Sequence, residues 1–175
     1  MGKTVVILGG GSGGIAAANI LRKNLKKEHR VILIDKNSYH YFAPSFLWYI
    51  FGSRTQDQVR RKIDVLKNKG IEYIKADISG IDIERKAVHT NVKDISYDYL
   101  IIALGAELDL DIIPGFNEAA YSFYNFEECV RLKDNLKNFS NGNVAVVISS
   151  MPFKCPAAPY EMAVLLDYYF KKNKK

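Results

Sequence analysis

A glycine-rich turn between an apolar run and an alanine-rich segment constrains the fold of this chain more than any other feature. Residues 5–8 form a short apolar run, Gly9, Gly11 and Gly14 follow it, and residues 15–25 have the composition of a helix. This order predicts a strand, a tight turn and a helix. The first glycine permits the turn, the second lets a pyrophosphate approach the backbone, and the third lets the helix pack closely on the strand. The turn therefore predicts a dinucleotide site.

A second apolar run, at residues 30–35, suits a parallel strand buried on both faces, and it ends at Asp35. Asp35 stands about 20 residues beyond the turn, where a carboxylate accepts the ribose hydroxyls of an adenosine. Its charge would repel a 2′-phosphate, which argues against NADP. Backbone N–H groups at the start of the helix, those of Ser12 and Gly13 among them, are expected to face the diphosphate. A chance glycine-rich turn is the alternative, and the pattern alone does not separate FAD from NAD.

The next segment is aromatic and irregular, and it is followed by short β-rich runs. Residues 36–52 predict a loop that leads into a short helix at 46–51, and residues 59–69 have helical spacing. Strands are expected at residues 71–76, 78–83, 87–90, 95–97 and 99–104, the last of them buried. The middle strands of this set predict a small antiparallel insertion.

Pro114 and Gly115 mark the expected domain boundary, because together they end the preceding order. Beyond it we expect a helix at residues 126–139, a buried strand at 143–148 and a helix at 160–170. The predicted fold class is therefore α/β. A Rossmann-like dinucleotide-binding domain at residues 1–115, with a parallel sheet, helices and the antiparallel insertion, is followed at 116–175 by the incomplete start of a second Rossmann-like domain.

Several segments together resemble a known family. The segments are VVILGGGSGG, LIDKNSYHYFAP, YDYLIIALGAELD and IPGF, and they resemble the two-dinucleotide-domain flavoproteins related to glutathione reductase, the pyridine nucleotide-disulfide oxidoreductase group. The phrase PFKCPAAPYE, residues 152–161, is similar to the active-site segment of sulfide:quinone oxidoreductases and of the flavoprotein subunit of flavocytochrome c sulfide dehydrogenase. The resemblance spans the whole chain and implies FAD as the cofactor.

The resemblance also implies further cofactor contacts. Ala103 and Gly105 match a second FAD-contacting turn, in which Leu104 replaces the usual threonine. Pro44 would lie near the isoalloxazine ring, and the backbone of Ala76 would lie near adenine. Lys36, which follows Asp35 directly, completes the expected cofactor-binding set.

The second strand-turn-helix start contains Cys155 and no glycine in its turn, which reads SSMPFKCPAAP. Pro152, Pro156 and Pro159 remove backbone donors, which argues against nicotinamide binding. Cys155 stands just before a helix, whose N-terminal dipole can stabilise a reactive thiolate. The resemblance implies that this thiolate takes sulfide sulfur, passes two electrons to FAD and works with a cysteine from the C-terminal half of those enzymes. A buried, inert cysteine is the alternative.

Three other side chains are candidates for a role at the site or in the core. Glu161 is a candidate acid/base or a helix cap. Cys129 lies on the apolar face of its expected helix and favours core packing. His40 is either a donor near the flavin or a half-exposed loop residue.

Composition excludes some classes of function. The net charge is +6, with basic clusters at Arg60–Lys62 and at Lys171, Lys172, Lys174 and Lys175, but no nucleic-acid reader motif accompanies them. No apolar run reaches the roughly 18 residues of a membrane span, so the expected location is cytoplasmic, or peripheral at the inner membrane face. No metal-ligand pattern is present. The expected partners are sulfide, a quinone, and either a second copy or a complementing chain.

We expect an FAD-dependent oxidoreductase of the sulfide:quinone type. A non-catalytic FAD- or nucleotide-binding module, or a subunit of a split flavoprotein, is the first alternative. An NADH-dependent flavin oxidoreductase is the second. In the resembling enzymes the C-terminal half supplies another FAD contact, the partner cysteine and the quinone pocket, so the activity of these 175 residues alone stays open.

Overall fold

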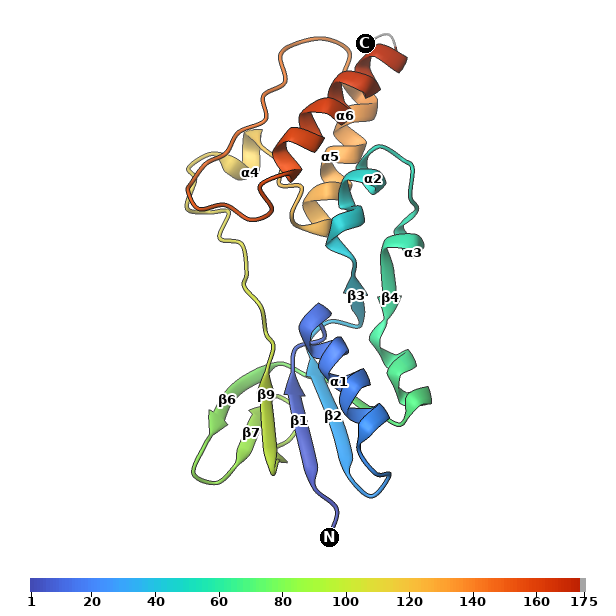
Figure 1. The fold of residues 1–175 in the computed structure, drawn as a ribbon. Coiled ribbons are helices and arrows are strands. Elements are labelled where there is room, and N and C mark those ends of the chain that lie inside the picture. Colours follow the sequence, from blue (N-terminus) through green and yellow to red (C-terminus); the bar gives the residue numbers. More distant parts are fainter. Residues whose placement is uncertain (174–175) are drawn as a thin grey trace. The chain divides into compact units, whose positions relative to one another are not determined.

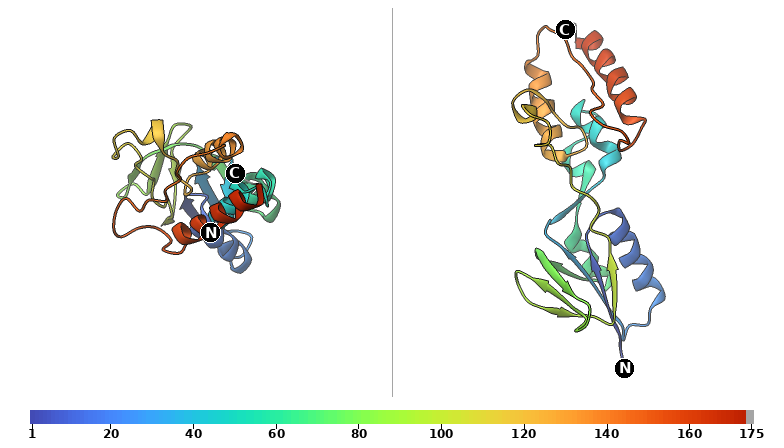
Figure 2. Two further views of the ribbon diagram at one scale, coloured as in Figure 1. Left: turned by 90° about the horizontal axis from the view of Figure 1, so that it is seen from above. Right: turned by 90° about the vertical axis from the view of Figure 1, so that its left-hand side faces the viewer.

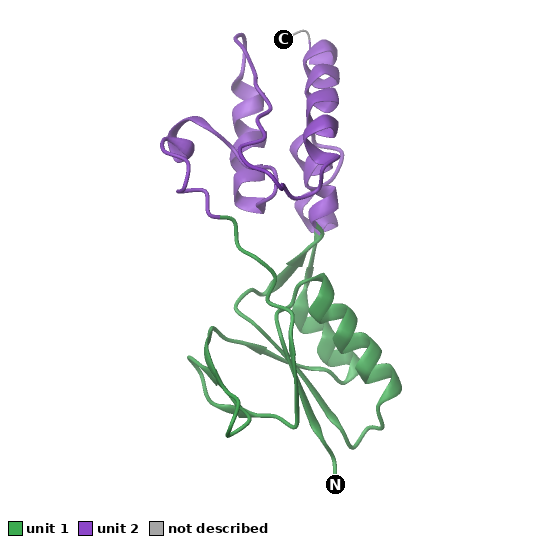
Figure 3. Cartoon of the chain, turned by 60° about the vertical axis from the view of Figure 1, so that its left-hand side comes forward, with its two compact units in different colours: residues 1–42, 60–108 green, residues 43–59, 109–175 purple. Residues whose placement is uncertain are grey.

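The computed structural model describes residues 1–173, so that Lys174 and Lys175 lie outside the described residues. The chain forms two compact units (Figure 3). The first contains residues 1–42 and 60–108, and the second contains residues 43–59 and the chain from Asp109 onward. These units differ from the expected division at residue 115, because residues 43–59 pack with the later part of the chain. As a division into dinucleotide-binding domains, 1–115 and 116–175 stay a prediction.

The first unit is built on a parallel four-stranded sheet. Its strands are β1 (Thr4–Leu8), β2 (Arg30–Asp35), β5 (Glu72–Lys75) and β9 (Tyr99–Ile102), in the order β5-β2-β1-β9 (Figure 1). Val6 pairs with Ile32 on one side and with Leu100 on the other. The β1 and β2 side chains are almost entirely buried because neighbouring layers cover both faces of the sheet.

Different elements cover the two faces (Figure 2). Helix α1 (Ser12–Asn24) packs through Ala18 on one face, against Ile7 and Leu33. On the other face, Val6 and Ile34 pack against Val88 of the antiparallel sheet. That sheet consists of β6 (Ile78–Asp82), β7 (Ala87–Thr90) and β8 (Ile95–Ser96), in the order β6-β7-β8. The expected fold class, with a parallel sheet and a small antiparallel insertion, is confirmed.

The helix expected at residues 59–69 is confirmed in part, because residues 63–69 are helical but residues 60–62 form a strand. Helix α3 (Gln56–Val59) ends where it was expected to begin, and β4 (Arg60–Lys62) pairs antiparallel with β3 (Tyr39–Tyr41). A 3-10 helix, η2 (Ile63–Lys69), follows. The apolar spacing reflects burial of Ile63 and Leu66 against the parallel sheet, which this helix also achieves. The guanidinium of Arg60 lies over the Tyr39 ring, 4.2 Å from its centroid, and supports the ribbon.

Strand β9 is less buried than expected. It pairs with β1 alone and forms one edge of the parallel sheet. Tyr99 and Ile102 are 61% and 62% exposed, while Leu100 and Ile101 pack on opposite faces of the sheet. The expectation of a strand buried on both sides is therefore wrong, because among residues 1–173 no strand pairs with its outer edge.

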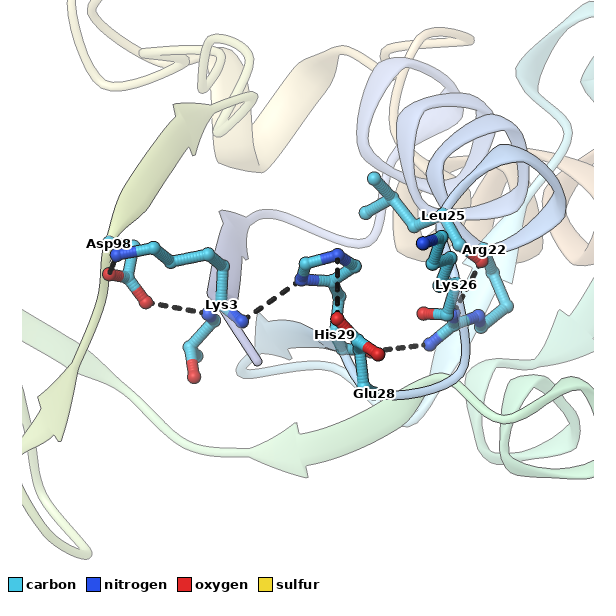
Figure 4. Close-up of polar contacts among 8 residues, drawn as sticks. Lys3, Arg22, Leu25, Lys26, Glu28, His29 and Asp98 are labelled. Carbon is cyan, nitrogen blue, oxygen red and sulfur yellow. Dashed lines mark hydrogen bonds and ion pairs between the residues drawn. The ribbon is translucent and has the colours of Figure 1, made fainter. Parts of the chain in front are cut away.

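Polar contacts join the ends of three segments at the amino-terminal edge of the parallel sheet (Figure 4). The backbone N–H of Lys3 donates to Nδ1 of His29 over 3.0 Å, and the Lys3 ammonium lies 2.9 Å from Asp98. The guanidinium of Arg22 donates to the carbonyls of Leu25, Lys26 and His29, at 2.7 to 2.9 Å. These bonds tie the turn at residues 25–29, which follows α1, to the last turn of that helix.

The second unit is helical. Its helices are α2 (Phe46–Ile50), which follows the 3-10 helix η1 (Ala43–Ser45), then α3, α4 (Phe116–Ala119), α5 (Phe126–Asn138) and α6 (Ala158–Asn173). Asn125 caps α5, because its side-chain oxygen accepts the N–H of Glu128 over 3.2 Å. The rings of Phe46 and Tyr49 contact Phe126, so α2 packs on α5.

The strand expected at residues 143–148 does not form. Val144 and Val147 are 47% and 73% exposed, and the segment has no regular secondary structure. Its β-branched composition suits a strand, but a strand needs a neighbour to pair with, and none of the described residues supplies one. Of the strand, turn and helix expected from residue 144 onward, the described residues thus form the helix, α6, and not the strand.

Within residues 1–173, no helix combines the length and the apolar composition that are needed to cross a bilayer.

Candidate functional site

The glycine turn connects β1 to α1 at the carboxyl edge of the parallel sheet. Gly9 has φ +103°, and a Cβ there would overlap the carbonyl oxygen of Ala103. A Cβ on Gly14 would overlap the carbonyl oxygen of Gly9. Both positions therefore require glycine, the first for conformation and space and the second for the close packing of α1 on the turn.

Gly11 has a different environment, because a Cβ there would meet no atom within 4 Å. The residue caps α1 with extended backbone, and its carbonyl accepts the N–H of Ile15 over 3.0 Å. The N–H groups at the start of a helix are unpaired donors and carry the positive end of the helix dipole. Beside Gly11 the structure thus has open space at a helix N-terminus, which fits a diphosphate.

Asp35 is tied directly to the turn. Its Oδ2 accepts the backbone N–H of Gly10 over 2.5 Å, and its Oδ1 accepts the N–H of Asn37 over 2.6 Å. An ionised carboxylate has about four lone-pair sites, so each oxygen can still accept a ribose hydroxyl. The carbonyl oxygen of Asp35 also accepts the N–H of buried Ala76 over 3.1 Å, which brings these two expected cofactor contacts together.

The second expected turn lies beside the first. The N–H of Ala103 donates to the carbonyl of Leu8 over 2.8 Å, and Gly105 has φ +74°. A Cβ on Gly13 would lie 3.8 Å from the Cβ of Ala103, an ordinary contact distance. The structure thus gathers the glycine turn, Asp35, Ala76 and Ala103 where the parallel strands end, which is where open α/β sheets bind ligands.

Two of the expected cofactor contacts, Lys36 and Pro44, stay predictions. Lys36 is exposed, and its ammonium lies 3.7 Å from a carboxylate oxygen of Glu107. Pro44 lies in η1, which belongs to the second unit. Its expected position beside the flavin ring therefore stays a prediction.

Gly10 is a site residue that the sequence reasoning missed. Besides its N–H bond to Asp35, its carbonyl oxygen lies 3.1 Å from Nδ1 of His40, so both of its backbone groups hold the turn in place. The dinucleotide-binding fingerprint treats this position as variable. Only the run of three consecutive glycines, Gly9 to Gly11, could have drawn attention to Gly10. His40, which is half-buried, is thereby placed beside the glycine turn.

The two cysteines have opposite environments. Cys129 is fully buried on α5, and burial, with the neighbouring Glu128 and Glu127 charges, raises its pKa to about 12. The expectation that it packs in the core is confirmed. Cys155 is exposed, with φ +54°, and its carbonyl accepts the N–H of Ala158 over 3.0 Å in the turn that starts α6. A buried thiol is therefore not what the structure has at Cys155.

Glu161 lies in the first turn of α6, and its Oε1 lies 3.4 Å from Nε1 of Trp48 on α2. No local sequence pattern predicts this contact, because the two residues are 113 positions apart. Glu161 is exposed, so its carboxylate is accessible as well as held.

Two family models match the chain. The model for pyridine nucleotide-disulphide oxidoreductases matches residues 3–148. The model for the central region of the sulfide dehydrogenase (flavocytochrome c) flavoprotein chain matches residues 129–175, which include Cys155 and Glu161.

Three curated relatives are each longer than this chain. The sequence is 31% identical to the mitochondrial sulfide:quinone oxidoreductase of Mus musculus, over 98% of this chain and 39% of the relative. It is 34% identical to the sulfide-quinone reductase of Aquifex aeolicus, over 99% of this chain and 40% of the relative. A type II NADH:quinone oxidoreductase of Staphylococcus haemolyticus is 31% identical over 79% of this chain and 35% of its own length.

A solved structure matches at the same level. The sulfide:quinone oxidoreductase from Aquifex aeolicus has a TM-score of 0.83 and 30% identity, over 98% of this chain and 40% of that one. The chain therefore spans about two fifths of the length of these two sulfide-oxidising relatives, from Mus musculus and Aquifex aeolicus.

Proposed function

The chain belongs to the pyridine nucleotide-disulphide oxidoreductase family of flavin-dependent oxidoreductases, whose cofactor is FAD, and from this premise we propose that it takes part in sulfide:quinone oxidoreduction. In this proposal Cys155 takes the sulfur of sulfide. The observation that carries it is an exposed cysteine at the start of α6, in a proline-rich turn where a nicotinamide site would need glycine.

The residues around the glycine turn fit FAD. Space beside Gly11 and the helix N-terminus would receive the diphosphate, and Asp35 would accept the adenosine ribose. Ala76 and the Ala103 to Gly105 turn would line the adenine and diphosphate ends. When bound, FAD supplies the acceptor for two electrons.

Cys155 has the properties that the proposed step needs. The Cys155 side chain is exposed in the turn before α6, so it is accessible to a small anion. A sulfur–sulfur bond would form between the Cys155 sulfur and the sulfide sulfur. From a thiolate and hydrosulfide, one S–H bond breaks and one proton is released, for which Glu161 is the proposed acceptor. The two electrons would be taken up by bound FAD, with a quinone as the final acceptor.

Two observations bear on the alternatives. Pro152, Pro156 and Pro159 lack backbone N–H groups, which disfavours an NADH site in the second unit, although some relatives use NADH. A nucleotide-binding module without turnover is the second candidate, and the open space beside Gly11 with the Asp35 carboxylate supports it by itself. For the oxidoreductase, in contrast, a complementing polypeptide is the proposed source of the quinone site. Peripheral contact with a membrane would supply the quinone.

Anaerobic reduction of the flavin tests the proposal. The purified chain is loaded with FAD and mixed separately with sulfide and with NADH, and the flavin absorbance is followed. Sulfide should bleach the flavin and NADH should not, while Cys155→Ala should abolish the sulfide reaction. Cys129→Ala, checked for folding by circular dichroism, is the matched control and should bleach like the wild type. A chain that binds FAD but ignores sulfide would leave only the binding module.

A further inference from the structure

Trp48 reaches from α2 to the first turn of α6. Its indole N–H points to Oε1 of Glu161, with 3.4 Å between the nitrogen and the oxygen. Both residues belong to the second compact unit. The separation is longer than a typical N–H···O bond of about 2.9 Å, so the contact is a weak one.

The residues that follow Trp48 contact both its backbone and its ring. The carbonyl of Trp48 accepts the N–H groups of Ser53 and Arg54, at 2.9 and 3.2 Å, in a turn that Gly52 closes with φ +80°. This turn folds Arg54 back, so that its guanidinium carbon lies 5.3 Å from the centroid of the Trp48 ring. A cation over the ring face and an anion at the ring N–H match the charge distribution of an indole.

The helix that carries Trp48 is anchored on α5. Phe46 and Tyr49 are 4% and 8% exposed, with ring centroids 5.5 and 4.9 Å from that of Phe126. The ammonium of Lys133 lies 4.0 Å from the centroid of Tyr49. Trp48, on the same short helix, is 46% exposed. Core packing therefore does not account for a tryptophan at this position.

We propose that Trp48 is a positioning residue that orients the Glu161 carboxylate, with Arg54 fixing the indole. This inference rests on the proposed function for the acid/base role of Glu161. One indole N–H occupies only one of the several acceptor sites of a carboxylate. The held carboxylate can therefore still take a proton released at Cys155, whose carbonyl starts the same helix.

Fluorescence tests the contact without any turnover. Trp48 is the single tryptophan of the sequence, so intrinsic emission reports on it alone. Glu161→Ala should raise the acrylamide quenching constant of Trp48, because the indole N–H loses the carboxylate beside it. Glu161→Gln keeps an oxygen acceptor and should stay near the wild type. Asp167→Asn, on α6 but paired with Lys171, is the matched control and should change nothing.

A second measurement tests positioning. In the FAD-loaded chain, Trp48→Phe keeps an aromatic ring but removes the N–H. It should slow sulfide-dependent bleaching several-fold and alter its pH profile, while the sulfide concentration that gives half the maximal rate stays unchanged. Unchanged quenching in Glu161→Ala, or a wild-type rate and pH profile in Trp48→Phe, would overturn the inference. If the wild-type flavin ignores sulfide, the proposed function fails, and the fluorescence result alone decides whether Trp48 holds Glu161.

Discussion

The backbone N–H of Gly10 donates a hydrogen bond to the Asp35 carboxylate over 2.5 Å, which ties the tip of β2 to the glycine turn. The acid that would bind the ribose and the backbone that would bind the diphosphate are therefore held as one piece. The site is preorganised, because neither element needs to move toward the other when a dinucleotide binds.

Replacing the charge at Asp35 should weaken FAD binding and lower the stability of the FAD-free chain by about 1 kcal/mol. In Asp35→Asn the single amide oxygen can accept only one of the two backbone N–H groups that the carboxylate holds, those of Gly10 and Asn37, and the charge-assisted bonds to the ribose are lost. Such bonds contribute about 1.5–3 kcal/mol, so FAD affinity should fall roughly 10- to 100-fold. Titration calorimetry measures the affinity, and thermal unfolding of the FAD-free chain checks stability. An unchanged affinity would remove Asp35 from the cofactor site.

Alanine at Gly14 should lower the stability of the chain, whereas alanine at Gly11 should leave the stability nearly unchanged. Gly14→Ala places a methyl group on the Gly9 carbonyl and should destabilise the chain by about 3 kcal/mol or more. Gly11→Ala meets open space and allowed backbone, so its stability should stay within about 1 kcal/mol of the wild type.

FAD binding completes this comparison. The Gly11→Ala methyl group would occupy the space proposed for the diphosphate, so affinity should fall on the order of 100-fold. Urea denaturation and FAD titration on both variants check the pair. A Gly11→Ala chain that binds FAD normally would contradict the placement of the diphosphate.

Sequence patterns predict the first unit well because its signals are local. The glycines, the apolar runs of β1 and β2 and Asp35 each express a constraint within a few residues, and the structure brings them together as expected. The patterns cannot show which strand lies at an edge. Tyr99 and Ile102 look like core residues, but their exposure depends on whether another strand pairs with β9.

The second unit was less predictable, for the same physical reason. The segment at residues 143–148 has a strand composition, but strand formation depends on a distant partner. The contact between Trp48 and Glu161 depends on how α2 packs on α5 through Phe126, which no local spacing reveals. Contacts between segments far apart in sequence are where reasoning from one sequence reaches its limit.

Alkylation should distinguish the two cysteines. Burial raises the pKa of Cys129 to about 12, so its thiol stays protonated at neutral pH and its side chain is inaccessible. Cys155 is exposed and should take up the reagent first. Iodoacetamide treatment of the native chain at pH 7.5, followed by mass spectrometry of peptides, should label Cys155 alone. Equal labelling of both in folded protein would contradict the burial of Cys129.

Asp98 should contribute stability only above acidic pH. The N–H of Thr4, and then the Lys3 ammonium, hold the pKa of Asp98 below its ordinary value of 3.8 (Figure 4). A carboxyl whose folded-state pKa is lowered stabilises the fold above its unfolded pKa, and the effect is lost as the pH falls through the folded value.

Asp98→Asn therefore should lower the unfolding midpoint at pH 7, and the difference from the wild type should shrink as the pH falls below about 4. Thermal unfolding across this pH range checks the expectation. Glu84→Gln, in the turn between β6 and β7, is an exposed carboxylate control and leaves the Lys3 contact intact. A constant difference between Asp98→Asn and the wild type at every pH would show that the Asp98 charge is not involved.

The most direct test of the proposed chemistry is to identify the product on Cys155 while the flavin is reduced. The FAD-loaded chain is mixed anaerobically with a limiting amount of sulfide, and the bleached flavin and the Cys155 peptide are quantified in the same sample. The account predicts one sulfur atom added to Cys155 for each flavin bleached, and neither change in Cys155→Ala. Flavin bleaching with unmodified Cys155, or equal bleaching in Cys155→Ala, would contradict it.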